Sequence, residues 1–192
     1  MQYTVFDDMT CCTEKDVQRL LTLVGKKRQQ QALRFKHLFG QWTSLKACEL
    51  LLQLWQLTPP LPDFEENDYG KPFLPHFPFF SISHCRAAVA VATDSRPIGI
   101  DVETIRHPSQ SLVEKVMNES EQVEIANADN PDVAFIQLWT KKEAWLKLQG
   151  TGIRNDLQQT LVFDRNTPQP LFTTYVKDNA YVLTIAQAQE IQ

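Results

Sequence analysis

Two pairs of charged side chains have the types and the spacing of a site for phosphate chemistry. Asp101 and Glu103 lie in a segment that predicts a β-strand, where alternate residues point to the same face. Glu143 and Lys147 lie four residues apart in a segment that predicts a helix, so they share one helix face. If the two faces meet, three carboxylates and one ammonium group surround a small volume. Because such carboxylates repel one another unless a cation lies between them, the pattern predicts phosphoryl transfer assisted by Mg²⁺, which binds carboxylate and phosphate oxygens.

The strand that carries the two acids has a simpler alternative interpretation. Asp101 and Glu103 could be solvent-facing residues of an edge strand. However, Ile98, Ile100 and Val102 occupy the opposite face, and a predicted hairpin precedes them. This alternation favours a central strand whose acidic face lines a wet cleft.

The helical pair also has a simpler alternative. A Glu followed by a Lys four residues later is a common exposed pair, worth only about 0.3 kcal/mol. Phe135 and Trp139 lie on the same helical stripe as Glu143 and Lys147. Two bulky apolar residues on that line predict a face turned inward, where unpaired charge is costly.

Composition limits the classes of partner. The chain has 192 residues, 43% of them hydrophobic and 22% charged, which is ordinary for a globular protein. Its net charge of −4 gives no general attraction to nucleic acid or to an anionic membrane, so any anionic ligand needs a local basic cluster. It contains no apolar run long enough for a membrane span and no signal-peptide pattern at its start, so we expect neither a membrane nor a nucleic-acid partner.

Cysteine usage points to a compartment. The spacing of the four cysteines fits neither a zinc site nor a disulfide framework. Reduced thiols in a cytoplasmic protein are the simplest expectation. The residues are Cys11, Cys12, Cys48 and Cys85.

The order of predicted elements indicates an α+β fold. Helical periodicity covers residues 14–57, with interruptions near Gly25 and Gly40, and returns over 110–149. Helices followed by strands occur twice, which predicts two similar α/β halves, 1–97 and 98–192, packed as a pseudo-dimer with a cleft between them. The predicted strands are 3–6, 79–83, 87–92, 98–103, 160–163, 171–176 and 181–185.

Several further residues could bind an anion. His84 and Ser83 lie at the end of a predicted strand, and both can donate hydrogen bonds to an oxyanion, although a lone histidine is more often structural. Lys71 lies in a predicted turn, where a turn role and a phosphate role are evenly balanced. A basic cluster in the first helical region is usually a solvated face, but it is the best local anion site in this acidic chain. It comprises Lys26, Lys27, Arg28, Arg34 and Lys36.

Four segments, taken in order, resemble the 4′-phosphopantetheinyl transferase superfamily, specifically its larger, monomeric, surfactin-synthetase-activating type. One such motif would be weak, but four in the right order and spacing are specific. The resemblance covers about residues 69–152. The segments are Tyr69–Pro72, Ile82–Cys85, Ile98–Glu103 and Trp139–Lys147, continued to Gly152.

The resemblance implies a reaction. Two similar halves would hold coenzyme A and Mg²⁺ in the cleft, and the phosphopantetheine arm would pass to a serine of an apo acyl or peptidyl carrier protein, leaving adenosine 3′,5′-bisphosphate. By the matching motifs, the metal ligands would be Asp101, Glu103 and Glu143. Lys147 and His84 would stabilise charge at the reacting phosphate. Glu143, directly or through a metal-bound water, is the favoured base.

The resemblance also implies the contacts to coenzyme A. Ser83 and His84 would contact phosphate oxygens, and Lys71 would face the nucleotide. Two positions depart from the family pattern: Cys85 stands where many members have serine, and Thr43 where relatives often have arginine. The candidates for the 3′-phosphate are Lys27, Arg28 and Arg34.

Two other functions fit the same residues. One is a catalytically silent module that binds coenzyme A or a carrier protein, although such a module has no need of mutually repelling carboxylates. The other is a metal-dependent phosphohydrolase that acts on a nucleotide. For an enzyme that modifies carrier proteins, we expect an exposed apolar docking surface near the cleft, within residues 108–130.

Overall fold

The structure is a computed structural model that describes residues 1–152, 156–164 and 169–189. The first part of the chain contains β1 (Gln2–Phe6), η1 (Met9–Cys11), α1 (Glu14–Leu21), α2 (Lys26–Leu33), α3 (Leu38–Trp55), β2 (Glu65–Glu66), β3 (Pro72–Phe73), β4 (Phe79–His84) and β5 (Val89–Asp94). The second part contains β6 (Ile98–Thr104), α4 (Gln110–Val116), α5 (Glu119–Ala126), α6 (Pro131–Gln149), η2 (Leu157–Gln159), β7 (Leu171–Lys177) and β8 (Tyr181–Gln187).

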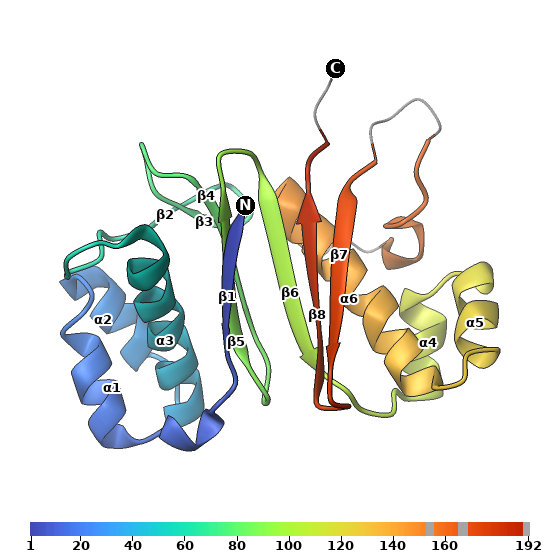
Figure 1. Ribbon diagram of the computed structural model, residues 1–192, viewed down its shortest axis with the longest axis horizontal. Coiled ribbons are helices and arrows are strands. Elements are labelled where there is room, and N and C mark those ends of the chain that lie inside the picture. The colour runs from blue at the N-terminus through green and yellow to red at the C-terminus, as the bar shows by residue number, and fades with distance from the viewer. Residues whose placement is uncertain (153–155, 165–168, 190–192) are drawn as a thin grey trace.

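Two antiparallel sheets with the same connectivity form the centre of the molecule. Their strand orders are β1-β5-β4 and β6-β8-β7, so in each sheet the first strand pairs with the last strand of a later hairpin. Helices α1, α2 and α3 lie on one side of the sheets, and α4, α5 and α6 lie on the other (Figure 1). The mixed α+β prediction is confirmed, while the division into halves at residue 97 stays a prediction.

Strands β4 and β6 belong to different sheets but lie side by side. The hydroxyl oxygen of Ser81 accepts a hydrogen bond of 3.1 Å from the Ile100 amide, and that of Ser83 accepts one of 3.2 Å from the Val102 amide. Serine hydroxyls thus satisfy amides of β6 that a backbone ladder would otherwise bond. This seam brings the end of β4 to the acidic strand.

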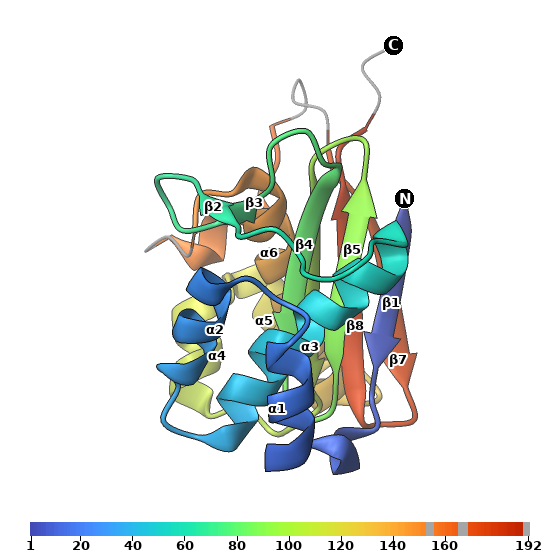
Figure 2. The same cartoon turned by 90° about the vertical axis from the view of Figure 1, so that its left-hand side faces the viewer.

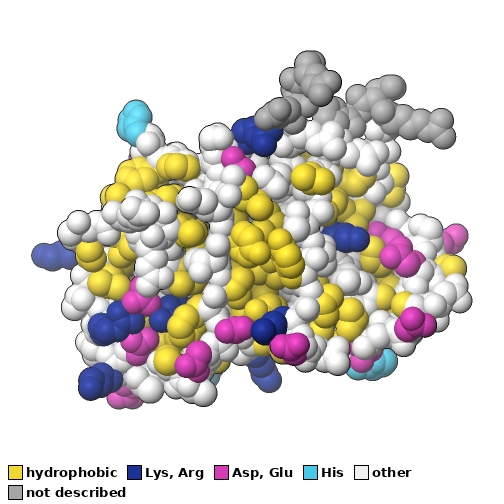
Figure 3. Space-filling model, in the orientation of Figure 1, with side chains coloured by type: hydrophobic (Ala, Val, Ile, Leu, Met, Phe, Trp, Pro, Cys, Tyr) yellow, Lys and Arg dark blue, Asp and Glu magenta, His cyan; other side chains and the backbone are white. Residues whose placement is uncertain are grey.

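Three apolar cores hold the layers together. One lies between the first three helices and β4 and β5, and another between the last three helices and β8. The third lies between the sheets, where the small Ala88, Ala90 and Ala92 pack with the β6 residues Ile100 and Val102. On the face shown in Figure 3, hydrophobic side chains form a band down the middle.

Most predicted elements are present, with shifted ends. The helical region 14–57 is three helices, and its second break lies at 34–37 rather than at Gly40, which is in the first turn of α3. Strand β5 begins two residues later than predicted, because the Cys85 amide bonds the Ala88 carbonyl in a turn. None of the helices in the described ranges is long and apolar enough to cross a membrane.

The predicted strand at 160–163 is wrong. The Thr160 amide bonds the Leu157 carbonyl at 3.2 Å, and the Val162 amide bonds the Gln159 carbonyl at 3.1 Å, so local turn bonds use these amides. The Phe163 ring lies edge-on to Trp145 of α6 instead, while Val162 is exposed. An apolar run alone could not separate these two outcomes.

Candidate functional site

Helix α6 lies directly against the acidic strand because residue 99 is glycine. A Cβ atom at Gly99 would collide with the carbonyl oxygen of Ala144 and approach the amide of Leu148. Asn130 caps the start of the helix, and Gly150, with φ of 68°, ends it. The close approach turns the face with Glu143 and Lys147 toward β6, which is the meeting of faces that the spacing predicted.

Asp101 is the centre of the resulting cluster. Its Oδ1 accepts hydrogen bonds from Lys147 Nζ at 2.7 Å and from Ser83 Oγ at 2.8 Å. Lys147 Nζ also lies 2.9 Å from Ser83 Oγ. The carboxylate is buried, so these two partners offset much of the cost of holding its charge away from water.

Two buried oxygen atoms in this cluster have no hydrogen-bond partner within the described part of the chain. They are Asp101 Oδ2 and Glu143 Oε1. A buried oxygen without a partner costs about 1–3 kcal/mol, and more when it is charged. Carboxylate oxygens that are free to accept a donor or a cation fit a hard metal ion, which prefers oxygen ligands.

The pKa of Glu143 also indicates that the cluster holds too little positive charge for its carboxylates. The pKa of Glu143 is raised to about 7, mainly by burial and then by the charges of Asp101 and Glu103, while Lys147 opposes the shift. Burial also raises the pKa of Glu103, with Asp101 adding to it. Lys147 and a hydrogen bond from Trp139 oppose this second shift. The carboxylates therefore repel one another as the sequence suggested.

The carboxylates are not arranged as a closed metal cage. Among the described residues, no three His, Cys, Asp or Glu side chains form a group that could hold a metal ion. Lys147 instead pairs with Asp101. The chemistry of the donors fits a divalent cation, and the ligand set Asp101, Glu103 and Glu143 stays a prediction.

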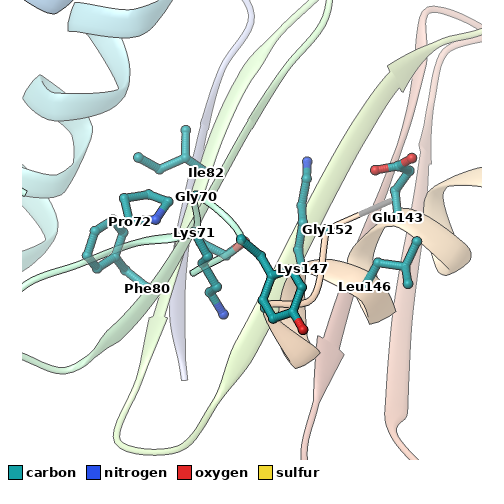
Figure 4. A pocket seen from close by; sticks show the side chains of 12 residues that line it. Gly70, Lys71, Pro72, Phe80, Ile82, Glu143, Leu146, Lys147 and Gly152 are labelled. Carbon is teal, nitrogen blue, oxygen red and sulfur yellow. The ribbon is translucent and has the colours of Figure 1, made fainter. Parts of the chain in front are cut away.

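A cavity of about 320 Å³ opens beside the cluster. Glu143 and Lys147 line it from α6, and their side chains extend in the same direction (Figure 4). The opposite wall is formed by the turn after β2 and by β4, and most of it is apolar. The other lining residues are Tyr69, Gly70, Lys71, Pro72, Phe80, Ser81, Ile82, Leu146, Gly150 and Gly152.

Lys71 lies in this wall but is engaged by the protein. Its Nζ donates to the carbonyl oxygens of Ile98 at 3.2 Å and Leu148 at 3.4 Å. Burial lowers the pKa of Lys71 to about 8. A partly desolvated ammonium beside an open cavity suits an anionic ligand. The contact of Lys71 with a nucleotide stays a prediction.

His84 ends β4 next to Ser83. Partial burial lowers the pKa of His84, and the nearby ammonium of Lys147 lowers it further. A neutral imidazole can donate one hydrogen bond and accept another. The predicted phosphate contact of His84 and Ser83 stays a prediction, although both lie beside Lys147.

The basic residues of α2 lie apart from the lining of the cavity. Arg28 is half-buried and donates to Ser44 Oγ at 2.8 Å, with its guanidinium 5.5 Å from the ring centre of Phe64. Lys27 bonds the Phe64 carbonyl at 3.4 Å, and Arg34 is exposed at the end of the helix. None of these three described residues lines the cavity, so their predicted role at a 3′-phosphate has no contact to support it.

The predicted docking region contains a groove. Residues of α4 and α5, including Val113, Val123 and Ile125, line a space of about 590 Å³. Val123 is 60% exposed. An exposed apolar side chain is therefore present in 108–130, while its use in docking stays a prediction.

Sequence reasoning missed the residues that position the charged ones. Gly99 was detectable, since a glycine inside a strand often marks a close backbone approach. Asn67 was also detectable, because an Asn two residues before Tyr69 in a turn is a common way to bond the backbone. The apolar wall formed by Phe80 and Ile82 was not, because nothing local says which face of a strand meets a cavity.

Comparisons with known proteins point to one family. A profile described as the 4′-phosphopantetheinyl transferase superfamily matches residues 97–189. The chain is 30% identical to 4′-phosphopantetheinyl transferase gsp of Aneurinibacillus migulanus over 164 residues, which cover 77% of this chain and 69% of that protein. It is 27% identical to 4′-phosphopantetheinyl transferase Sfp of Bacillus subtilis (strain 168) over 159 residues, covering 79% and 70%. With 4′-phosphopantetheinyl transferase AcpT of Salmonella typhi it shares 34% over 99 residues, covering 47% and 51%.

Proposed function

This chain belongs to the 4′-phosphopantetheinyl transferase superfamily, and on that premise we propose that it transfers the 4′-phosphopantetheine arm of coenzyme A to a serine of an apo acyl or peptidyl carrier protein. The other product is adenosine 3′,5′-bisphosphate. The observation that carries the proposal is the convergence of Asp101, Glu143 and Lys147 beside a cavity. Two carboxylate oxygens there have no hydrogen-bond partner among the residues that the structure describes.

The chemical step replaces the bridging oxygen on the β-phosphorus of coenzyme A by the serine oxygen of the carrier. The serine hydroxyl oxygen of the carrier attacks the β-phosphorus of the coenzyme A pyrophosphate. The bond from that phosphorus to the bridging oxygen breaks, and the α-phosphate keeps this oxygen and leaves as the 5′-phosphate of adenosine 3′,5′-bisphosphate. The negative charge of two phosphates resists this attack, so catalysis depends on positioning and on nearby positive charge.

A divalent cation, Mg²⁺ by preference, would be held by Asp101, Glu103 and Glu143, and when bound it neutralises charge on the pyrophosphate. The fit of these residues to a cation rests on Asp101 Oδ2 and Glu143 Oε1, which accept no hydrogen bond from the described part of the chain. Lys147, which pairs with Asp101 and lines the cavity, stabilises charge at the reacting phosphate with its Nζ.

Proton transfer and phosphate binding fall to neighbouring groups. Glu143 takes the serine proton, directly or through a water, and its raised pKa makes it a better base than an ordinary carboxylate. Ser83 and His84 contact phosphate oxygens: His84 donates a hydrogen bond, and Ser83 does so by turning its single hydroxyl proton from Asp101 to the phosphate. Lys71 faces the nucleotide, and Lys27, Arg28 and Arg34 are the candidates for its 3′-phosphate.

The setting we propose is a monomer in the cytoplasm, without nucleic-acid or membrane partners. The net charge of −4 supports the absence of general attraction to polyanions. The four cysteines are free thiols, which suits a reducing compartment.

The test is a transfer reaction. The protein is incubated with coenzyme A, Mg²⁺ and an apo carrier protein, and the carrier is examined by mass spectrometry. We expect the carrier to gain one phosphopantetheine arm, and we expect EDTA to abolish the gain because the three carboxylates need a cation between them.

The matched control is Asp101→Ala, which should bind a carrier but modify none. No mass gain with several acyl and peptidyl carriers would overturn the proposal. Release of phosphate or nucleotide without any carrier would point to a phosphohydrolase instead.

A further inference from the structure

The turn between β2 and β3 contacts the end of helix α6. Asn67 Nδ2 donates a hydrogen bond of 2.8 Å to the carbonyl oxygen of Gly150. Lys71 Nζ donates to the carbonyl oxygen of Leu148 at 3.4 Å. The last carbonyls of a helix have no partner within it, so these two bonds satisfy groups that would otherwise need water. Figure 2 shows β2 and β3 beside α6.

The same Asn67 side chain fixes the shape of the turn. Its Oδ1 accepts hydrogen bonds from the amides of Tyr69 at 3.0 Å and Lys71 at 2.9 Å. The Gly70 amide bonds the Asn67 carbonyl at 2.9 Å, and φ at Gly70 is 80°. One amide group therefore holds the turn with its oxygen and anchors it to the helix with its nitrogen.

Both sides of this contact belong to walls of the cavity. Tyr69, Gly70 and Lys71 line one wall, and Glu143 and Lys147 line the other from α6. The separation of the walls thus depends on how the turn sits on the helix end.

Residue 150 must be glycine for the contact to form as it does. A Cβ atom there would lie 3.0 Å from Asn67 Nδ2 and 3.1 Å from Lys71 Cδ, and φ is 68°. Asn67 itself is outside the lining of the cavity. Asn67 lines only an adjoining space, so its influence on a ligand within this cavity passes through the residues that it holds.

We propose that Asn67 is a positioning residue that sets the spacing between the Tyr69–Lys71 wall and α6, and thereby the affinity of the cavity for coenzyme A. This inference rests on the proposed function. Without the anchor, only the longer bond from Lys71 to the Leu148 carbonyl joins the turn to the helix end, so the two move more freely and the bound molecule must order them itself. Ordering flexible groups on binding reduces affinity, so the effect falls on KM for coenzyme A rather than on kcat.

Two substitutions separate the two roles of the side chain. Asn67→Ala removes both the acceptor and the donor. Asn67→Asp keeps an oxygen that can accept from the Tyr69 and Lys71 amides, but it places a carboxylate oxygen against the Gly150 carbonyl. The anchor is lost in both variants, whereas the shape of the turn is kept only in the second.

The matched control is Asn130→Ala at the other end of the same helix. Asn130 Oδ1 accepts a hydrogen bond of 3.2 Å from the Val133 amide as the N-cap of α6. Loss of an N-cap weakens the helix without touching the β2–β3 turn. It reports what general destabilisation of α6 does to activity.

Steady-state kinetics and calorimetric titration with coenzyme A are measured on folded protein. Both Asn67 variants should raise KM and the dissociation constant for coenzyme A about tenfold, with kcat changed less than threefold, and Asn130→Ala should leave both constants unchanged. Wild-type affinity in both Asn67 variants, or an equal loss in Asn130→Ala, would overturn the inference.

Hydrogen exchange distinguishes failure of this inference from failure of the proposed function. Amides near Gly150 should exchange faster in both Asn67 variants than in Asn130→Ala, whether or not the protein modifies a carrier. Faster exchange with no transfer by the wild type would retain the anchor and reject the transferase. Unchanged exchange at Gly150 in the variants, together with carrier modification by the wild type, would reject the anchor and retain the transferase.

Discussion

Helix α6 carries two lysines, five positions apart and on different faces, and each pairs with an acidic residue inside the molecule. Lys142 is fully buried, and its Nζ bonds Glu121 Oε2 at 2.8 Å and the Leu157 carbonyl at 2.8 Å. Lys147 pairs with Asp101 at 2.7 Å, but its side chain is 29% exposed. The first pair joins α6 to α5 and to the 157–159 turn, and the second lies at the cavity.

The two pairs differ in how completely their atoms are bonded. Glu121 Oε2 also accepts from the Asn118 amide in a capping box at the start of α5. In contrast, the Lys147 cluster leaves Asp101 Oδ2 and Glu143 Oε1 without partners among the described residues. A complete set of bonds stabilises a fold, whereas an incomplete buried set costs free energy that a bound ligand can recover. The comparison separates a structural pair from a functional one on one helix.

The largest expected effect is the loss of stability on removal of the structural lysine. Lys142→Ala leaves Glu121 buried without its cation, so the free energy of unfolding should fall by about 3–5 kcal/mol. Denaturant unfolding followed by circular dichroism measures it.

A double variant, Lys142→Met with Glu121→Leu, should recover most of that stability, since replacing both charges by apolar groups removes the unpaired carboxylate. A loss below about 1 kcal/mol in Lys142→Ala would mean that water reaches the pair, and the comparison would fail.

The functional pair should show the opposite behaviour. Asp101→Asn should reduce kcat/KM for carrier modification by roughly 100-fold, about 2.7 kcal/mol of transition-state stabilisation. The free energy of unfolding should change by less than about 1 kcal/mol, because the Lys147 side chain is 29% exposed and its ammonium remains solvated. A loss of stability as large as that of Lys142→Ala would show that this pair is structural too.

The smallest expected effect is a pH dependence of stability caused by Glu143. Its folded pKa, about 7, lies above the ordinary value of 4.5, so folding favours the protonated form. The stability that this group contributes is complete below pH 4.5 and is lost as the pH rises through 7. Glu143→Gln should therefore be more stable than the wild type at pH 8 by on the order of 2 kcal/mol, allowing for solvent screening of a shift worth about 3 kcal/mol.

Thermal unfolding of both proteins in EDTA between pH 4 and pH 8 measures this difference. The advantage of Glu143→Gln should shrink toward pH 4.5. A difference that does not vary with pH would mean that the Glu143 carboxyl is not desolvated, and the contrast with Glu121 would weaken.

Local pattern was sufficient for much of the site. The alternation of Asp101 and Glu103 and the four-residue spacing of Glu143 and Lys147 placed each pair on one face before any fold was known. The strand expected at 160–163 is wrong because two of its amides bond within local turns and its Phe163 ring packs on Trp145. The apolar character of a segment predicts that it packs against the protein, but not which surface it packs against.

Sequence by itself determined which groups share a face, because backbone periodicity is local and carboxylates on one face repel wherever it points. Only the tertiary structure decided which lysine meets which acid. Lys142 and Lys147 are of the same residue type and lie on the same helix. Lys142 pairs with an acid of α5 and Lys147 with an acid of β6, and these partners give them different roles. The close approach at Gly99 and the anchor at Asn67 likewise depend on backbone groups far away in the sequence, and such distances are set only when the layers pack.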